Sequence, residues 1–68
     1  MSLSVRVNGK DETLAALTVA ELVQARGITG QRGVAVAVNG TVVPAGAWPA
    51  TRLAEGDAIE IVRPFGGG

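Results

Sequence analysis

The end of the chain carries the arrangement that points most directly to chemistry, the run Arg63-Pro64-Phe65-Gly66-Gly67-Gly68. Glycine loses the most backbone freedom on ordering and has no side chain to bury, so this run predicts a thin, flexible thread. The thread ends in an α-carboxylate with a reference pKa of about 3.3–3.7, which is ionised at neutral pH and can attack a phosphoanhydride. We therefore expect Gly68 to be the reactive residue, with Gly66 and Gly67 narrow enough to enter a partner's active site. A frayed terminus is the alternative, and the rest of the chain has to decide between the two.

The composition predicts one small, soluble domain. The chain has 68 residues, of which 47% are hydrophobic but only 3% aromatic, so its core must consist mainly of aliphatic side chains. Six basic residues balance six acidic ones, whereas a nucleic-acid-binding domain normally has a basic excess on one face. No apolar run approaches the roughly 20 residues of a membrane helix, and the first residues lack a signal-peptide core. We expect a cytoplasmic protein that binds neither nucleic acid nor membrane.

Several reactive residue types are absent from the sequence. The chain has no Cys, no His and no Tyr. A disulfide, a thiolate zinc site and an iron–sulfur cluster are therefore excluded, and the commonest general base is missing. A chain this short also has little room for a concave pocket with convergent polar groups. We expect the protein not to be an enzyme and to hold no metal or cofactor of its own.

The N-terminal third predicts a hairpin followed by a short helix. Residues 2–7 alternate between polar and apolar, which is the period of a half-buried strand. Asn8-Gly9 is a strong signal for a type I′ turn, and residues 10–14 are polar enough for an edge strand. Thr18 and Glu21 have the spacing of a capping box, with Leu17 and Leu22 at the flanking staple positions. The helix is predicted from Val19 to Arg26, ending at Gly27.

The second half predicts three more strands. Residues 34–38 are apolar on both faces, as in an interior strand. Asn39-Gly40 predicts a second hairpin, whose returning strand Thr41-Val42-Val43 ends at Pro44. Residues 45–50 are expected to link this strand to the next, with Trp48 packing over one end of the core. After a turn at residues 55–57, the last strand is predicted at residues 58–63.

This order of elements predicts an α+β fold. Two strands, a helix, two strands and a final strand can form a mixed sheet of about five strands packed on one helix. The segment between the first and last strands is long enough for the last strand to return parallel to the first. We expect residues 1–64 to form one domain and residues 65–68 to form a flexible tail.

Taken together, these parts resemble the ubiquitin-like β-grasp sulfur carriers, and most closely the ThiS family of thiamine biosynthesis. The most specific segment is Val36-Ala37-Val38-Asn39-Gly40-Thr41-Val42-Val43-Pro44, followed by Trp48 and by Leu53-Ala54-Glu55-Gly56-Asp57. An apolar strand and the terminal diglycine then complete the pattern, and Thr18-Val19-Ala20-Glu21-Leu22 at the helix start also fits. The resemblance covers essentially the whole chain. Each segment is a weak signal, but in this order and at this length they form a specific pattern.

The resemblance implies a protein that other enzymes modify at its C-terminus. An E1-like adenylyltransferase of the ThiF type would use ATP and magnesium to convert the Gly68 carboxylate to an acyl adenylate. A sulfur donor such as a cysteine persulfide would then displace AMP and leave a thiocarboxylate. Thiazole synthase of the ThiG type would accept this sulfur. The absence of Cys fits the scheme, because no internal thiol competes for the adenylate.

The residues leave other functions open. The related molybdopterin carriers share the fold and the tail, and carriers of other sulfur pathways exist. A protein modifier would join the activated Gly68 to a lysine of a target, and a plain interaction module would not use its tail. For docking, we expect the exposed face of the sheet and the base of the tail, Val62 and Pro64, to form the partner surface. Phe65 is its expected anchor, unless it folds back over the sheet edge.

Overall fold

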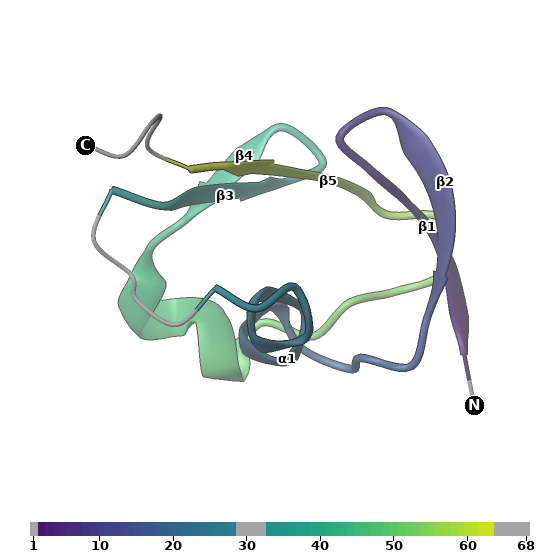
Figure 1. The fold of residues 1–68 in the computed structure, drawn as a ribbon, viewed down its shortest axis with the longest axis horizontal. Coiled ribbons are helices and arrows are strands. Elements are labelled where there is room, and N and C mark those ends of the chain that lie inside the picture. Colours follow the sequence, from purple (N-terminus) through teal and green to yellow (C-terminus); the bar gives the residue numbers. More distant parts are fainter. Residues whose placement is uncertain (1, 29–32, 64–68) are drawn as a thin grey trace.

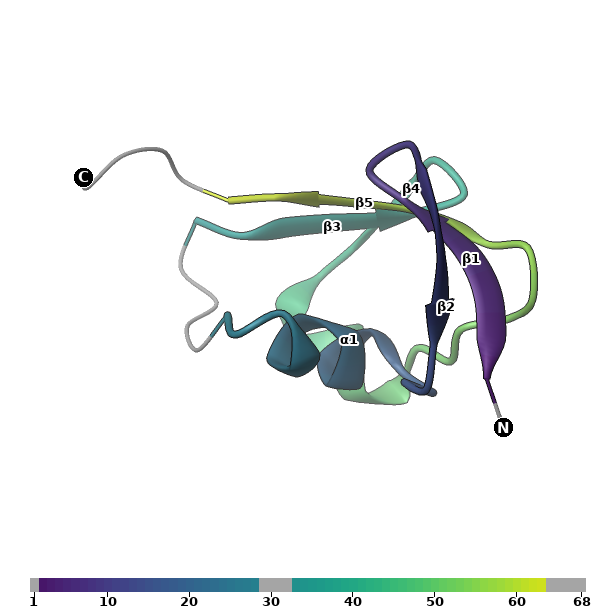
Figure 2. The same cartoon turned by 45° about the vertical axis from the view of Figure 1, so that its right-hand side comes forward.

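The computed structural model describes residues 2–28 and 33–63, which form a sheet with one α-helix packed against it (Figure 1). The helix and a neighbouring 3₁₀ helix lie on the same side of the sheet, as the turned view also shows (Figure 2). The elements in chain order are β1 (Leu3–Val7), β2 (Lys10–Leu14), α1 (Val19–Ala25), β3 (Ala35–Val38), β4 (Thr41–Val43), η1 (Ala45–Ala50) and β5 (Ala58–Val62).

The sheet has five strands in the order β2-β1-β5-β3-β4. Strands β1 and β2 form one antiparallel hairpin, and β3 and β4 form the other. Strand β5 lies between the hairpins, parallel to β1 and antiparallel to β3. The predicted α+β fold with a mixed sheet is therefore confirmed, including the parallel return of the last strand. β2 is an edge strand and β3 an interior strand, as the sequence predicts.

Both hairpins turn at an Asn-Gly pair, as predicted. Asn8 and Asn39 each have φ of 52°, and Gly9 and Gly40 each have φ of 83°. Positive φ at both central residues is the requirement of a type I′ turn. Asparagine tolerates this region better than most residues, and glycine adopts it without a steric penalty. The two turns thus have the same backbone geometry.

Helix α1 begins and ends with the signals that the sequence contains. The Thr18 hydroxyl accepts a hydrogen bond from the backbone N–H of Glu21 at 3.2 Å, and the Glu21 carboxylate accepts one from the N–H of Thr18 at 3.2 Å. This is the predicted capping box. At the other end, Gly27 has φ of 78° and donates its N–H to the Gln24 carbonyl, while Ile28 donates to that of Val23. This pair of bonds is a Schellman motif, which ends the helix at Ala25, one residue earlier than predicted.

The core lies between the sheet and the two helices. Trp48 is 3% exposed, and its indole Nε1 donates to the carbonyl of Val43 at 2.9 Å. The prediction that Trp48 packs on the core is confirmed. The segment that carries it is a 3₁₀ helix, whereas the sequence predicted only a link. The buried core residues are Val5, Val7, Val19, Leu22, Val23, Val36, Trp48, Leu53 and Ile59.

The remaining differences concern the ends of elements. Strand β5 ends at Val62 rather than at Arg63, and β3 begins at Ala35 rather than at Val34. Hydrogen-bonded pairing decides such ends, and hydropathy alone does not reveal it. Within residues 2–28 and 33–63, the structure has no helix with the length and apolar character needed to cross a bilayer.

Candidate functional site

The site predicted from the sequence centres on the C-terminal tail, and the structure describes only its base. Val62 is the last residue of β5. The other predicted site residues lie outside the described residues; they are Pro64, Phe65, Gly66, Gly67 and Gly68. The predicted boundary between domain and tail lies there as well.

The strand that leads to the tail is central in the sheet. β5 pairs with β1 through residues 58 and 59, and with β3 through residues 59–62. Ile59 is 1% exposed and belongs to the core. A paired strand is hard to displace, and the pairing with β3 fixes the chain as far as Val62.

The outer face of the sheet, away from α1, carries exposed aliphatic side chains beside the end of β5. Directly opposed residues point to the same face, and the register pairs Ala35 with Val62 and Ala37 with both Glu60 and Val42. Val62 is 62% exposed and Val42 is 68% exposed. We call Ala35, Ala37, Val42 and Val62 the outer apolar patch. It includes Val62, the last residue of β5, and its role as a partner surface stays a prediction.

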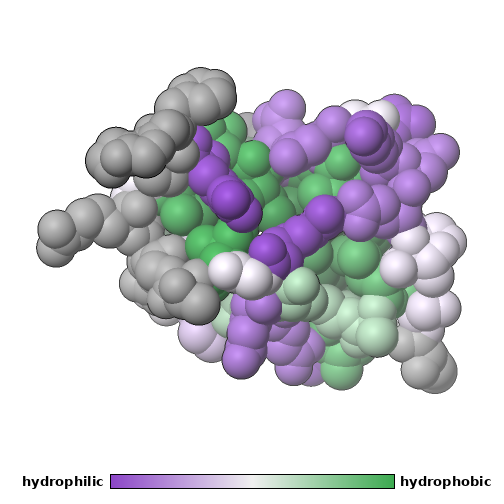
Figure 3. All heavy atoms as spheres, viewed as in Figure 1, coloured by the Kyte–Doolittle hydropathy of each residue, from purple (hydrophilic) through white to green (hydrophobic). Residues whose placement is uncertain are grey.

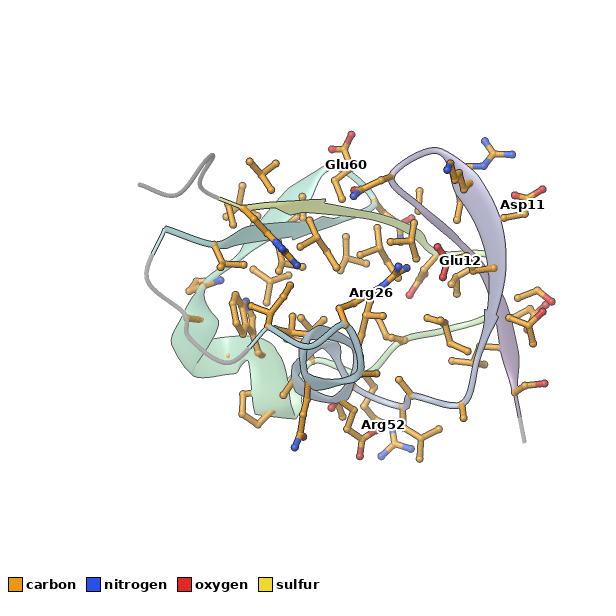
Figure 4. All side chains as sticks on the ribbon, in the orientation of Figure 1. Asp11, Glu12, Arg26, Arg52 and Glu60 are labelled. Carbon is orange, nitrogen blue, oxygen red and sulfur yellow. The ribbon has the colours of Figure 1, made fainter. Side chains whose placement is uncertain are left out.

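Charged side chains border this patch. Glu60 is exposed and points away from α1 (Figure 4). Farther along the same face, the Arg6 guanidinium lies 3.3 Å from the Asp11 carboxylate, with the two side chains 63% and 85% exposed. A pair this exposed adds little stability, about 0–1 kcal/mol. The pair instead makes the β1–β2 part of this face polar.

Comparison with known proteins shows which family has this sequence and fold. The sequence profile of the ThiS family matches residues 5–68. The chain belongs to the ThiS family. The predicted resemblance to ThiS-type sulfur carriers is confirmed, and the match includes the tail residues that the structure does not describe. No curated protein matches the chain.

Two solved structures support the family membership. The crystal structure of the thiamine biosynthesis protein ThiS from Geobacter metallireducens is 37% identical, with a TM-score of 0.77 and complete coverage of both chains. The solution NMR structure of a thiamine biosynthesis protein from the same organism is 36% identical, with a TM-score of 0.81. That alignment covers 97% of this chain and 88% of the other. The predicted ubiquitin-like fold is therefore that of known ThiS proteins.

The inner side of this ThiS-family domain is partly open between the sheet and α1. Figure 3 shows hydrophobic side chains gathered there, with hydrophilic side chains lying across them. Arg26 and Glu12 point toward one another (Figure 4), with Nη2 and Oε1 2.7 Å apart. This ion pair joins the end of α1 to the edge strand β2. Beside it lies a hollow of about 360 Å³ near the end of β5, lined by Val7, Asn8, Arg26, Ile28, Ile61 and Arg63.

The described residues of this ThiS-family chain offer no metal site. Within residues 2–28 and 33–63, no three acidic side chains gather closely enough to hold an ion. What the described residues do offer is an exposed aliphatic surface, the outer apolar patch, which includes Val62 at the end of β5.

Sequence reasoning missed one feature of the site. Asn8 and Asn39 were assigned to turns only, yet both side chains bind the backbone of β5. Their residue type was the available signal, since Asn, unlike Gly, adds a donor and an acceptor at a turn position. What the sequence did not show is that both turns lie beside the last strand.

Proposed function

We propose that the protein is a cytoplasmic sulfur carrier of thiamine biosynthesis and that its Gly68 carboxylate is the point of sulfur attachment. The observation that carries this proposal is the ThiS-family match over residues 5–68, which extends through the three terminal glycines. The similarity to ThiS of Geobacter metallireducens over the whole of both chains supports it. The same match favours the thiamine pathway over the molybdopterin pathway.

The first step activates a carboxylate that is itself a poor electrophile. A carboxylate oxygen of Gly68 attacks the α-phosphorus of ATP, the α–β phosphoanhydride bond breaks, and magnesium pyrophosphate leaves. The product is an acyl adenylate on Gly68. An E1-like adenylyltransferase of the ThiF type supplies the ATP and magnesium site, and Gly66 and Gly67 enter its active site because they lack side chains.

The second step replaces AMP with sulfur. The terminal sulfur of a donor's cysteine persulfide attacks the acyl carbon, and AMP leaves with the electron pair of the broken C–O bond. A thiol then reduces the acyl disulfide, which releases the thiocarboxylate and leaves the thiol oxidised to a disulfide with the donor's cysteine. The sequence has no Cys, so no thiol of the carrier can intercept the adenylate. A thiazole synthase of the ThiG type accepts the sulfur.

In this scheme the protein is a co-substrate and not an enzyme. The partner enzymes supply the acid–base groups, and the carrier supplies a reactive end and a docking surface. We assign docking to the outer apolar patch together with the base of the tail at Val62, Pro64 and Phe65. The exposure of Val42 and Val62 supports this assignment, because aliphatic area of this kind is useful when a partner buries it.

Phe65→Ala is expected to weaken binding to the adenylyltransferase by about 2 kcal/mol or more, because a buried aromatic anchor contributes that much at interfaces. In a carrier-dependent ATP–pyrophosphate exchange assay, this corresponds to a rise in KM of about thirtyfold. The melting temperature should stay that of the wild type. Activation of the wild-type chain in the same assay tests the proposed function itself.

Leu17→Ala is the matched control for this experiment. Leu17 is a large hydrophobic residue, 47% exposed, that directly precedes Thr18, the N-cap of α1, on the other side of the sheet. Its truncation should leave KM unchanged. A Phe65→Ala chain that melts clearly earlier but binds normally would refute the docking role and favour a Phe65 that covers the domain.

A further inference from the structure

Strand β5 lies between two Asn-Gly turns, one from each hairpin. Its neighbours run in opposite directions, since β1 is parallel to β5 and β3 is antiparallel to it. The turn that follows β1 therefore lies toward the C-terminal end of β5, while the turn that follows β3 lies at its beginning. Both turns approach β5 in the two ribbon views (Figures 1 and 2). Asn8 consequently lies toward the C-terminal end of β5, and Asn39 lies at its beginning.

The Asn8 side chain continues the ladder between β1 and β5 after β1 has ended. The N–H of Arg6 donates to the carbonyl of Asp57 at 2.9 Å, and that of Asn8 donates to Ile59 at 2.8 Å. A parallel ladder advances two residues at a time, so the next donor should reach the carbonyl of Ile61. The Asn8 amide Nδ2 occupies this place at 3.2 Å, and Oδ1 accepts the Ile61 N–H at 2.8 Å.

These two bonds satisfy backbone groups that face away from β3. On the side of β5 that faces β3, the Ala58 N–H donates to the Asn39 side chain and the Ala58 carbonyl accepts from the Asn39 N–H. On the side that faces β1, the Ile59 carbonyl accepts from the Asn8 N–H. Successive residues of a strand point their backbone groups to alternate sides. The N–H and carbonyl of Ile61 therefore face β1, where the Asn8 side chain binds both.

Asn39 makes a similar contact at the other end of the strand. Its Oδ1 accepts the Ala58 N–H at 3.0 Å, and its Nδ2 donates to the Asp57 carboxylate at 3.0 Å. Ala58 is the first residue of β5, whereas Ile61 precedes Arg63, the last described residue, by only two positions. The two asparagines thus offer a matched pair, alike in backbone geometry and different in distance from the tail.

We propose that Asn8 is a positioning residue for C-terminal activation: its side chain holds β5 at Ile61 and so fixes the point from which the tail extends. This inference rests on the proposed function. Without the Asn8 amide, the β1 side of β5 would be unpaired beyond Ile59 and the strand end would be held by β3 alone. An end held on one side only moves more freely, so the Gly68 carboxylate would spend less time in the reactive position.

The structural half of the test compares Asn8→Gly with Asn39→Gly. Glycine keeps the positive φ of the turn and removes only the side chain. By NMR, Asn8→Gly is expected to accelerate hydrogen exchange at the Ile61 amide by about tenfold or more beyond the change in global stability, since one bond of that amide is lost. Asn39→Gly should leave Ile61 unchanged after the same correction.

The functional half measures ATP–pyrophosphate exchange with a ThiF-type adenylyltransferase. For Asn8→Gly we expect kcat to fall about tenfold with little change in KM, because a misplaced reactive group slows the reaction while the docking patch is intact. Asn39→Gly should keep the wild-type kcat. Asn8→Asp should give an intermediate kcat, since its carboxylate can accept the Ile61 N–H but cannot donate to the Ile61 carbonyl.

Each outcome decides a different point. A wild-type kcat for Asn8→Gly would overturn the positioning role, whatever happens to the Ile61 amide. An equal fall in kcat for Asn39→Gly would overturn it as well, because general destabilisation would then explain both. A wild-type chain that the adenylyltransferase does not activate would refute the proposed function, and the role of Asn8 in it, while the exchange data would still report on the β5 contact.

Discussion

A chain that lacks Gly67 and Gly68 is expected to lose C-terminal activation completely while keeping its fold. Two residues span up to about 7 Å of extended chain, so the new carboxylate on Gly66 cannot reach the position that the partner's active site holds for Gly68. The fold should persist because, within residues 2–28 and 33–63, the buried core runs from Val5 to Ile59 and so includes neither deleted residue.

Circular dichroism checks that the truncated chain keeps its fold, and pyrophosphate exchange checks that it is no longer activated. The truncated chain should also inhibit activation of the wild-type chain competitively, because it retains Phe65 and the outer apolar patch. Loss of the circular dichroism spectrum would show that the tail contributes to the fold. Continued activation of the truncated chain would show that the reactive group does not need to lie at Gly68.

Leu22→Ala is expected to lower the free energy of unfolding by about 2–5 kcal/mol, the range for a large aliphatic residue truncated in a core. Leu22 is 1% exposed and lies on the face of α1 that meets the sheet. Alanine is the best helix former, so the loss comes from the cavity and not from helix propensity. A domain of 68 residues has only about 3–10 kcal/mol of stability in total, so this variant should be partly unfolded near physiological temperature.

Urea denaturation of Leu22→Ala and Leu17→Ala measures this effect on two residues of the same type. Leu17 is 47% exposed, and its truncation should cost less than about 1 kcal/mol. A similar loss at both positions would mean that α1 is not packed as the structure has it.

The fold could be predicted from the sequence because its local signals are strong and agree with one another. The Asn-Gly turns, the capping box of Thr18 and Glu21, and Gly27 each determine one local conformation, and the alternating strands then admit few arrangements. The 3₁₀ helix η1 was missed because residues 45–50 have no apolar periodicity. Its position depends on Trp48, which is buried in the core and donates a hydrogen bond to the Val43 carbonyl.

The predictions for the candidate site rest on the end of the chain and on the family resemblance. The glycine tail and the family resemblance point to Gly68 without any structure, and this site stays a prediction because Gly68 lies outside the described residues. Val62 is exposed at the end of β5, and its role in docking also stays a prediction. The contact of Asn8 with Ile61 joins residues 53 positions apart. It follows from the parallel pairing of β1 and β5, so no local pattern could indicate it.

The mass of the intact chain after incubation with the adenylyltransferase, ATP, magnesium and a persulfide sulfur source, followed by reduction with a thiol, tests the central claim most directly. We expect one oxygen to be replaced by sulfur and fragmentation to locate the change at Gly68. A chain joined through Gly68 to a lysine of another protein would identify a modifier instead of a carrier. An unchanged mass with an adenylyltransferase of verified activity would show that Gly68 does not accept sulfur.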